Sequence, residues 1–279
     1  MESAVPMMWY EEQKKWDRES HSDSEQLLGV ELDSFVHSMS MIAKCMDAVA
    51  DSGVIREMEV ARKLSFTNYA FNLLWSAWAN AMNGRLDIAT SSWRSTDEAP
   101  EFLMAFHANP QLATDVGFSQ VKVSTARRAV RDALEAAQPG KGKEWFRRRE
   151  QNAKDLQAFS HISVKVVDMA LGIRLDNGKK VAVMRPGGIV GSLTLRPIAA
   201  SITAAASELL VIVVTVFRDR TPAIATWWDN QGLDQNRKHM AKLADELSAM
   251  PRVSGQVTRI DYVRVYAKQS QSSSNGVRA

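Results

Sequence analysis

The sequence contains one cysteine, Cys45, in 279 residues, and a single thiol cannot form a disulfide within the chain. Scarcity of cysteine is typical of proteins in a reducing compartment, where disulfides rarely persist. The opening residues, MESAVPMMWYEEQKKWDRES, also lack the apolar segment of a secretory signal and carry acidic residues early. These two absences favour a cytoplasmic protein.

The sequence also lacks the short motifs that mark common enzyme chemistries. It has no HExxH, CxxC, GxSxG, GxxxxGK[ST] or DxDxDG motif. Its histidines show no metal-ligand spacing; they are His21, His37, His107, His161 and His239. We therefore expect no metal and no cofactor, and a non-catalytic role is favoured over an enzymatic one.

Long apolar runs are scarce as well, and one stands out, from Pro197 to Phe217, with Glu208 as its single charge. Its length would span a bilayer, which needs roughly 20 apolar residues. However, nearly half of it is Ala, Ser or Thr, and a carboxylate near mid-membrane costs about 2–4 kcal/mol. A helix buried in the core of a bundle explains the same pattern. We favour burial, in which Glu208 needs a partner, and keep a single membrane span as the alternative.

A heptad pattern predicts the first strong helix, which we expect to start near Ser22–Asp23 and to stop at Gly53. Its apolar residues recur at alternating spacings of four and three, at Leu28, Leu32, Phe35, Met39, Ile42, Met46 and Val49. This seam packs either inside the chain, which we favour, or against a second copy in a homodimer. Cys45 lies on the same helix, so a packed thiol is favoured over a nucleophile.

Periodicity and turn residues outline the remaining elements. They predict helices over about 54–82, 121–137 and 143–171, and a helix from Arg85 that Pro100 breaks, kinks or restarts before Asn109-Pro110. The stretch GIRLDNGKKVAVM alternates around an Asp-Asn-Gly turn and predicts a small β-hairpin, which a strand over 257–268 would extend.

The predicted fold is therefore mainly α: a multi-helix bundle around the apolar helix, with a small β-hairpin or short antiparallel sheet. We expect one helical domain over residues 22–268. A polar N-terminal extension over 1–21 precedes it, and a disordered tail over 269–279 follows it.

Positive charge is concentrated between Lys122 and Lys154, where ten basic residues face four acids. An excess of this kind attracts phosphate backbones or acidic proteins, although a solvated helix face gives the same pattern. The candidate nucleic-acid contacts are Arg127, Arg128, Arg131, Lys143, Arg147, Arg148, Arg149 and Lys154.

Three residues are the candidates for catalysis. His161 falls on the charged side of the predicted 143–171 helix, opposite its apolar face, where an imidazole either meets solvent or lines a cleft. Arg94 and Glu98 are spaced i, i+4 on a predicted helix and are expected to form an ion pair, more often structural than part of a site.

The region from about Thr90 to Phe217 resembles a loose group of uncharacterised all-helical bundle proteins, some of them HEPN-like. The shared features are WRSTDE, a helix ending in HANP, a tryptophan-bearing helix with FSHISVK, a hairpin or loop, and an apolar helix. The resemblance implies a helical bundle. HEPN-type ribonucleases carry an arginine and a histidine on one helix with four to six residues between them, whereas Arg149 precedes His161 by twelve and Lys154 occupies an expected arginine position. The catalytic signature of that family is therefore missing.

The favoured hypothesis is an intracellular, non-catalytic helical interaction module that contacts nucleic acid or an acidic partner through its basic region. The alternatives are a HEPN-like ribonuclease or other hydrolase that uses His161, and a membrane-associated protein with one span.

Overall fold

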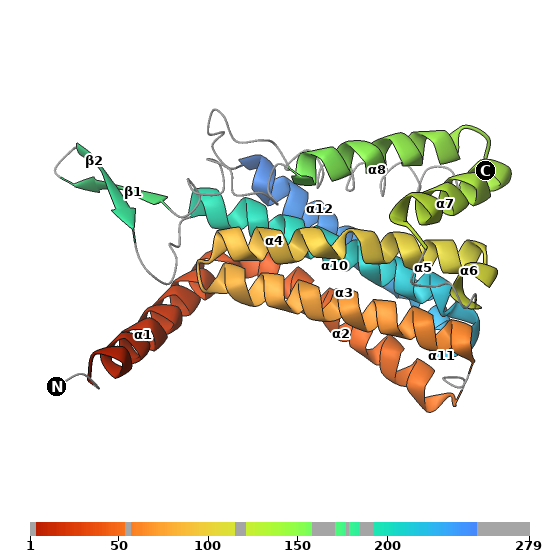
Figure 1. The fold of residues 1–279 in the computed structure, drawn as a ribbon, viewed down its shortest axis with the longest axis horizontal. Coiled ribbons are helices and arrows are strands. Elements are labelled where there is room, and N and C mark those ends of the chain that lie inside the picture. Colours follow the sequence, from red (N-terminus) through yellow and green to blue (C-terminus); the bar gives the residue numbers. More distant parts are fainter. Residues whose placement is uncertain are drawn as a thin grey trace.

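The computed structural model describes residues 4–53, 57–114, 121–157, 171–176, 179–184 and 192–249, with side chains from 11 to 151 and from 195 to 249 within those ranges, Leu247 excepted. The described residues form a mainly α-helical bundle (Figure 1), as the sequence predicts. Its principal helices are α1 (Ala4–Leu27), α2 (Gly29–Asp51), α3 (Met58–Met82), α4 (Leu86–Thr96), α5 (Glu98–Ala108), α6 (Gln111–Thr114), α7 (Val123–Ala137), α8 (Lys141–Gln157), α10 (Ser192–Val216), α11 (Pro222–Trp227) and α12 (Leu233–Ala249).

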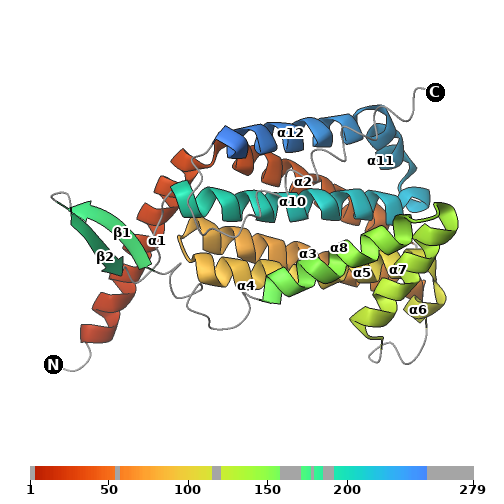
Figure 2. The same ribbon diagram turned by 90° about the horizontal axis from the view of Figure 1, so that it is seen from above.

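The apolar helix α10 runs through the bundle between α12 on one side and α3 and α4 on the other (Figure 2). It is long and apolar enough to cross a membrane, and 72% of its most apolar stretch is buried. Ala199, Ile202 and Leu209 have no solvent-exposed surface and pack in the main core with residues of α2 and α3. The expected burial of this helix is confirmed.

The heptad seam on α2 packs inside the chain. Phe35, Ile42 and Val49 are fully buried, and the ring of Phe35 stacks on that of Trp78 from α3 at 4.3 Å between centroids. These contacts use the seam within one chain, in agreement with the favoured alternative. The homodimer through Leu28–Val49 stays an untested prediction.

The N-terminal region differs from the expectation. Ser22–Asp23 lie inside α1, and the chain breaks at Leu28 instead, whose backbone leaves the helical region before α2 begins. Asp17 accepts two hydrogen bonds of 2.8 Å from Arg85, and Ser24 donates one to the carbonyl of Met82. Because these contacts hold α1 against the end of α3, the helix continues through the predicted start signal.

A second difference lies between α4 and α5. The chain turns at Asp97, so Arg94 and Glu98 belong to two separate helices. Pro100 falls in the first turn of α5, where its missing N–H costs no helical hydrogen bond. The restart of the helix that the sequence allows here therefore occurs at Glu98, two residues before Pro100.

The α7–α8 hairpin, defined as residues 123–157, lies on the opposite side of α5 from α3 (Figure 1). Its turn is closed by Glu135, whose carboxylate accepts hydrogen bonds from the backbone N–H of Gly140 and of Lys143. The Gly140 bond is the main cause of the lowered pKa of Glu135. α7 packs on α5 through a small apolar cluster made of Ala105, Ala126 and Val130, with Phe102, Met104, Leu112, Ala129, Leu134 and Trp145 packed around it.

Strands β1 (Leu171–Asp176) and β2 (Lys179–Met184) pair antiparallel, with Leu171 opposite Met184 and Asp176 opposite Lys179. They occupy the stretch over which the sequence predicts a hairpin. Because Leu171 begins β1, the helix predicted over 143–171 does not reach its expected end. The strand over 257–268 and the tail over 269–279 lie outside the described residues.

Candidate functional site

The α7–α8 hairpin presents its arginines in two directions. Arg127 and Arg149 turn toward the bundle, whereas Arg128, Arg147 and the other exposed basic side chains face solvent. Arg127 and Arg149, the inner pair, bind carboxylates of the bundle, whereas the exposed basic side chains form an outer set at the surface.

Arg149 is the more deeply buried of the inner arginines, with 5% of its side chain exposed. Its guanidinium pairs with Glu208 of α10 and lies 3.3 Å from Oδ1 of Asp97, at the turn between α4 and α5. The same guanidinium lies 5.9 Å from the ring centroid of Trp145, one turn back on α8. The expectation that Glu208 finds a partner is confirmed. Arg149 itself is not part of the exposed basic surface, so its selection as a nucleic-acid contact is corrected.

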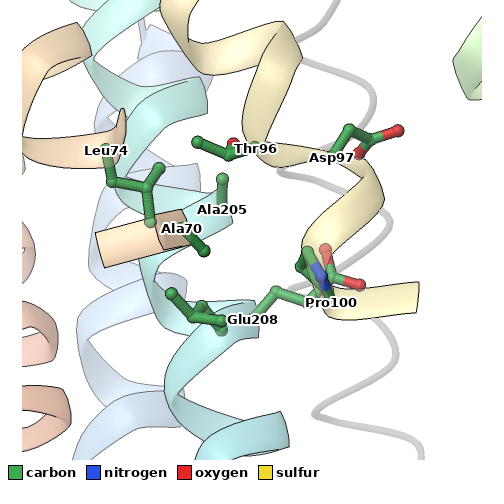
Figure 3. A pocket seen from close by; sticks show the side chains of 8 residues that line it. Ala70, Leu74, Thr96, Asp97, Pro100, Ala205 and Glu208 are labelled. Atoms are coloured by element: carbon green, nitrogen blue, oxygen red, sulfur yellow. The ribbon is translucent and has the colours of Figure 1, made fainter. Parts of the chain in front are cut away.

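A small hollow lies beside this ion pair (Figure 3). It has room for about one water molecule, which excludes a small-molecule substrate from it. Glu208 extends from α10 toward Pro100, on one side of the hollow. The lining residues are Ala70, Leu74, Thr96, Asp97, Pro100, Ala205, Glu208 and Leu209.

Arg127 is held by a second buried carboxylate. Its Nε donates a 2.8 Å hydrogen bond to Oε2 of Glu101, a residue of α5 with no exposed surface. Burial raises the pKa of Glu101 to about 7, against the opposing influence of Arg127 and Arg149. Because 16% of the Arg127 side chain is exposed, this residue also anchors the hairpin rather than presenting a free cation.

The outer set of the hairpin remains accessible. Arg128, Lys143 and Arg147 are exposed and form no salt bridge with any described residue. Arg131 pairs with Asp132 and Arg148 with Glu144, both at the surface, where such pairs contribute little to stability and exchange readily. Lys154 lies on α8, but its side chain is outside the described residues. The predicted nucleic-acid set is thus divided: Arg128, Arg131, Lys143, Arg147 and Arg148 stay candidates.

Of the three predicted catalytic residues, Arg94 and Glu98 lie within the described structure. His161 lies outside the described residues, so its prediction stays untested. No ion pair joins Arg94 to Glu98 among the described side chains, because α4 ends before Glu98 begins α5. The expected Arg94–Glu98 ion pair is therefore wrong. In the part of the chain that is described, no group of three or more His, Cys, Asp or Glu side chains could hold a metal ion.

Two further groups carry side chains that could do chemistry: a pair of histidines, which the sequence does not bring together, and Cys45. The rings of His37 and His239 stack at 4.9 Å between α2 and α12, and the hydroxyl of Ser34 lies 3.2 Å from Nδ1 of His239. Burial, followed by the nearby His239, lowers the pKa of His37. Ser34 is itself buried, so this Ser–His pair joins helices and is not an accessible nucleophile. Cys45 is buried too, and burial raises the pKa of its thiol to about 11.

Comparison of the chain with protein-family models, with curated proteins and with solved structures gave no match. The HEPN-like resemblance therefore stays a prediction, and any function has to be argued from the site itself.

Proposed function

We propose that the chain is a non-catalytic interaction module that binds nucleic acid through the outer face of the α7–α8 hairpin, and that it acts in the cytoplasm. The observation that carries this proposal is the division of the hairpin arginines. Arg127 and Arg149 pair with carboxylates inside the bundle, while Arg128, Lys143 and Arg147 are exposed and form no salt bridge with a described residue.

The chemistry of the outer face suits a phosphate backbone. Lys143 and Arg147 are spaced i, i+4, which places them on one side of α8 about 6 Å apart along its axis. Exposed cations of this kind release counterions when they meet phosphates, which gives tight binding at low salt without base recognition. The buried anchors hold α8 in place, so the cations are presented from a fixed helix.

The test compares two charge-reversed variants of the full chain. The first carries Arg128→Glu, Lys143→Glu and Arg147→Glu. The control carries Lys44→Glu, Lys238→Glu and Lys242→Glu, which are exposed positions on α2 and α12 and give the same change in net charge. Binding to labelled single- and double-stranded oligonucleotides is measured by fluorescence anisotropy over a salt series.

We expect the hairpin variant to lose most of its affinity and the control to keep it. For a duplex, loss of three phosphate contacts makes the negative slope of log affinity against log salt shallower by about 3. Absence of binding by the unaltered chain at low salt, or an equal loss in both variants, would overturn the proposal. Binding to polyglutamate but not to nucleic acid would also overturn it and identify an acidic protein as the partner class.

The two alternative functions gain no support from the described residues. The hydrolase hypothesis depends on His161, and its other two candidates do not meet. The membrane-span hypothesis depends on α10, which is mostly buried by the other helices.

A further inference from the structure

Glu101 is a buried acid at the contact between α5 and the α7–α8 hairpin. Its side chain has no exposed surface, and only one of its two carboxylate oxygens has a hydrogen-bond partner, the Nε of Arg127. The other oxygen, Oε1, is buried with no partner among the described residues. A buried carboxylate that keeps a full charge needs partners at both oxygens, so this position favours the protonated form.

We propose that Glu101 is a proton-controlled latch: the protonated carboxyl keeps the α7–α8 hairpin docked on α5, and its ionisation favours release of the hairpin. On release the carboxylate reaches water, and its proton passes to solvent. This inference concerns the regulation of the candidate site, and the latch itself does not depend on what the outer face binds.

The hairpin is the element that responds because few contacts dock it: a small apolar cluster on α5 and the ion pairs of Arg127 and Arg149. Among the described residues, its apolar contact with α5 has three fully buried members, Ala105, Ala126 and Val130, with half-buried side chains packed around them. A docked segment with so little buried apolar area opens without unfolding the rest of the bundle. The state of one buried carboxyl is therefore a large share of the docking free energy.

The charged groups around Glu101 come from every packed neighbour. Arg127 on α7 and Arg149 on α8 favour the ionised form, and Asp97 at the start of α5 opposes it. Glu208 on α10 shares Arg149 with Asp97, so that guanidinium is divided among carboxylates. From α3, Arg62 donates to the carbonyl of Ala113 and Lys63 pairs with Glu59, so neither forms a salt bridge with Glu101. The effect of burial on the pKa of Glu101 outweighs the effects of these charges.

The direction of the pH effect follows from the raised pKa. Folded Glu101 holds its proton up to about pH 7, whereas the carboxyl of a released hairpin has the ordinary value near 4.5. The docked state is therefore favoured most below about pH 4.5, and that advantage is lost as the pH rises through about 7. If the outer face binds nucleic acid as proposed above, release also frees Arg127 for phosphate, so affinity rises over the same interval.

Hydrogen exchange of the full chain tests the latch without any ligand. Exchange of the α7 and α8 amides is followed by mass spectrometry from pH 5 to pH 8 in the unaltered chain and in Glu101→Gln. The amide side chain has the shape of the protonated acid and still accepts from Arg127. Comparing the two proteins at each pH removes the intrinsic pH dependence of exchange.

The matched control is Glu31→Gln. Glu31 is also fully buried and accepts a hydrogen bond from one arginine, Arg196. Its Oε2 has no partner among the described residues. It belongs to α2, away from the hairpin. Amides of α3 around Leu74 report global unfolding in all three proteins.

We expect hairpin exchange in the two proteins to agree within about fivefold near pH 5, and to be at least about tenfold faster in the unaltered chain than in Glu101→Gln at pH 7.5, with α3 unchanged. Glu31→Gln should keep the profile of the unaltered chain. The latch is overturned if the unaltered chain and Glu101→Gln share one profile, or if α3 and the hairpin open together. A hairpin that opens as expected in a chain without nucleic-acid affinity would sink the proposed function and leave the latch standing.

Discussion

Arg149 of α8 and Glu208 of α10 lie 59 positions apart and form an ion pair inside the bundle. The pair joins the basic hairpin to the central helix, and Asp97 completes it from the turn between α4 and α5. Glu208, the one charge in the apolar run, and Arg149, the most buried arginine of the basic region, are therefore each other's ion-pair partner.

Breaking this pair from one side should be costly. Arg149→Met removes the buried cation that the half-buried Glu208 and Asp97 share, so we expect a loss of about 3 kcal/mol in the free energy of unfolding. Urea unfolding followed by circular dichroism measures it. The double variant Arg149→Met with Glu208→Met should lose less than the sum of the two single changes. Simple additivity would mean that the two side chains do not interact.

The close approach of α7 and α8 gives a second prediction. A Cβ at Gly142 would lie 2.2 Å from the carbonyl oxygen of Arg131 and 2.8 Å from the backbone nitrogen of Glu135, so Gly142→Ala must push the helices apart. We expect a loss of about 1–3 kcal/mol and faster tryptic cleavage within the hairpin. Gly29→Ala is the control, because its Cβ meets no atom within 4 Å. Equal stability of the two variants would contradict the packing described.

Cys45 should be chemically inert in the folded protein. With a pKa of about 11, only about one thiol in a thousand is ionised at pH 8, and the side chain is buried. A thiol-specific disulfide reagent should therefore react slowly with the native chain and fully in concentrated guanidinium chloride. Ser40→Cys, at an exposed position of the same helix, adds a thiol that should react at once. Rapid native reaction of Cys45 would show that α2 does not pack as described.

Most of the helices could be predicted from the sequence because their signals are local. The α2 seam, the α7 span and the burial of α10 follow from spacing and composition alone. The break at Asp97 and the continuation of α1 through Ser22–Asp23 could not be predicted in the same way. Both depend on contacts with residues far along the chain, such as Asp17 with Arg85.

The arginines of the candidate site also show what local sequence signals cannot predict. Arg127 and Arg128 are neighbours, as are Arg148 and Arg149, and in each pair one side chain anchors the hairpin while the other reaches solvent. Consecutive residues on a helix differ by 100° in direction, so charge clustering finds both members of a pair and distinguishes neither. The positions of the partner carboxylates decide which arginine of each pair turns inward. Among these carboxylates the sequence singles out only Glu208, as a charge within an apolar run.

The central helix is also synthesised late. α10 begins at Ser192, so α1 to α8 are translated before it, yet it supplies much of the surface on which α2, α3 and α5 pack. Until then, those helices can pack on one another, as Phe35 of α2 does on Trp78 of α3, but their faces toward α10 stay uncovered. The contacts that centre on α10 therefore form late in synthesis, after α1 to α8 have been translated.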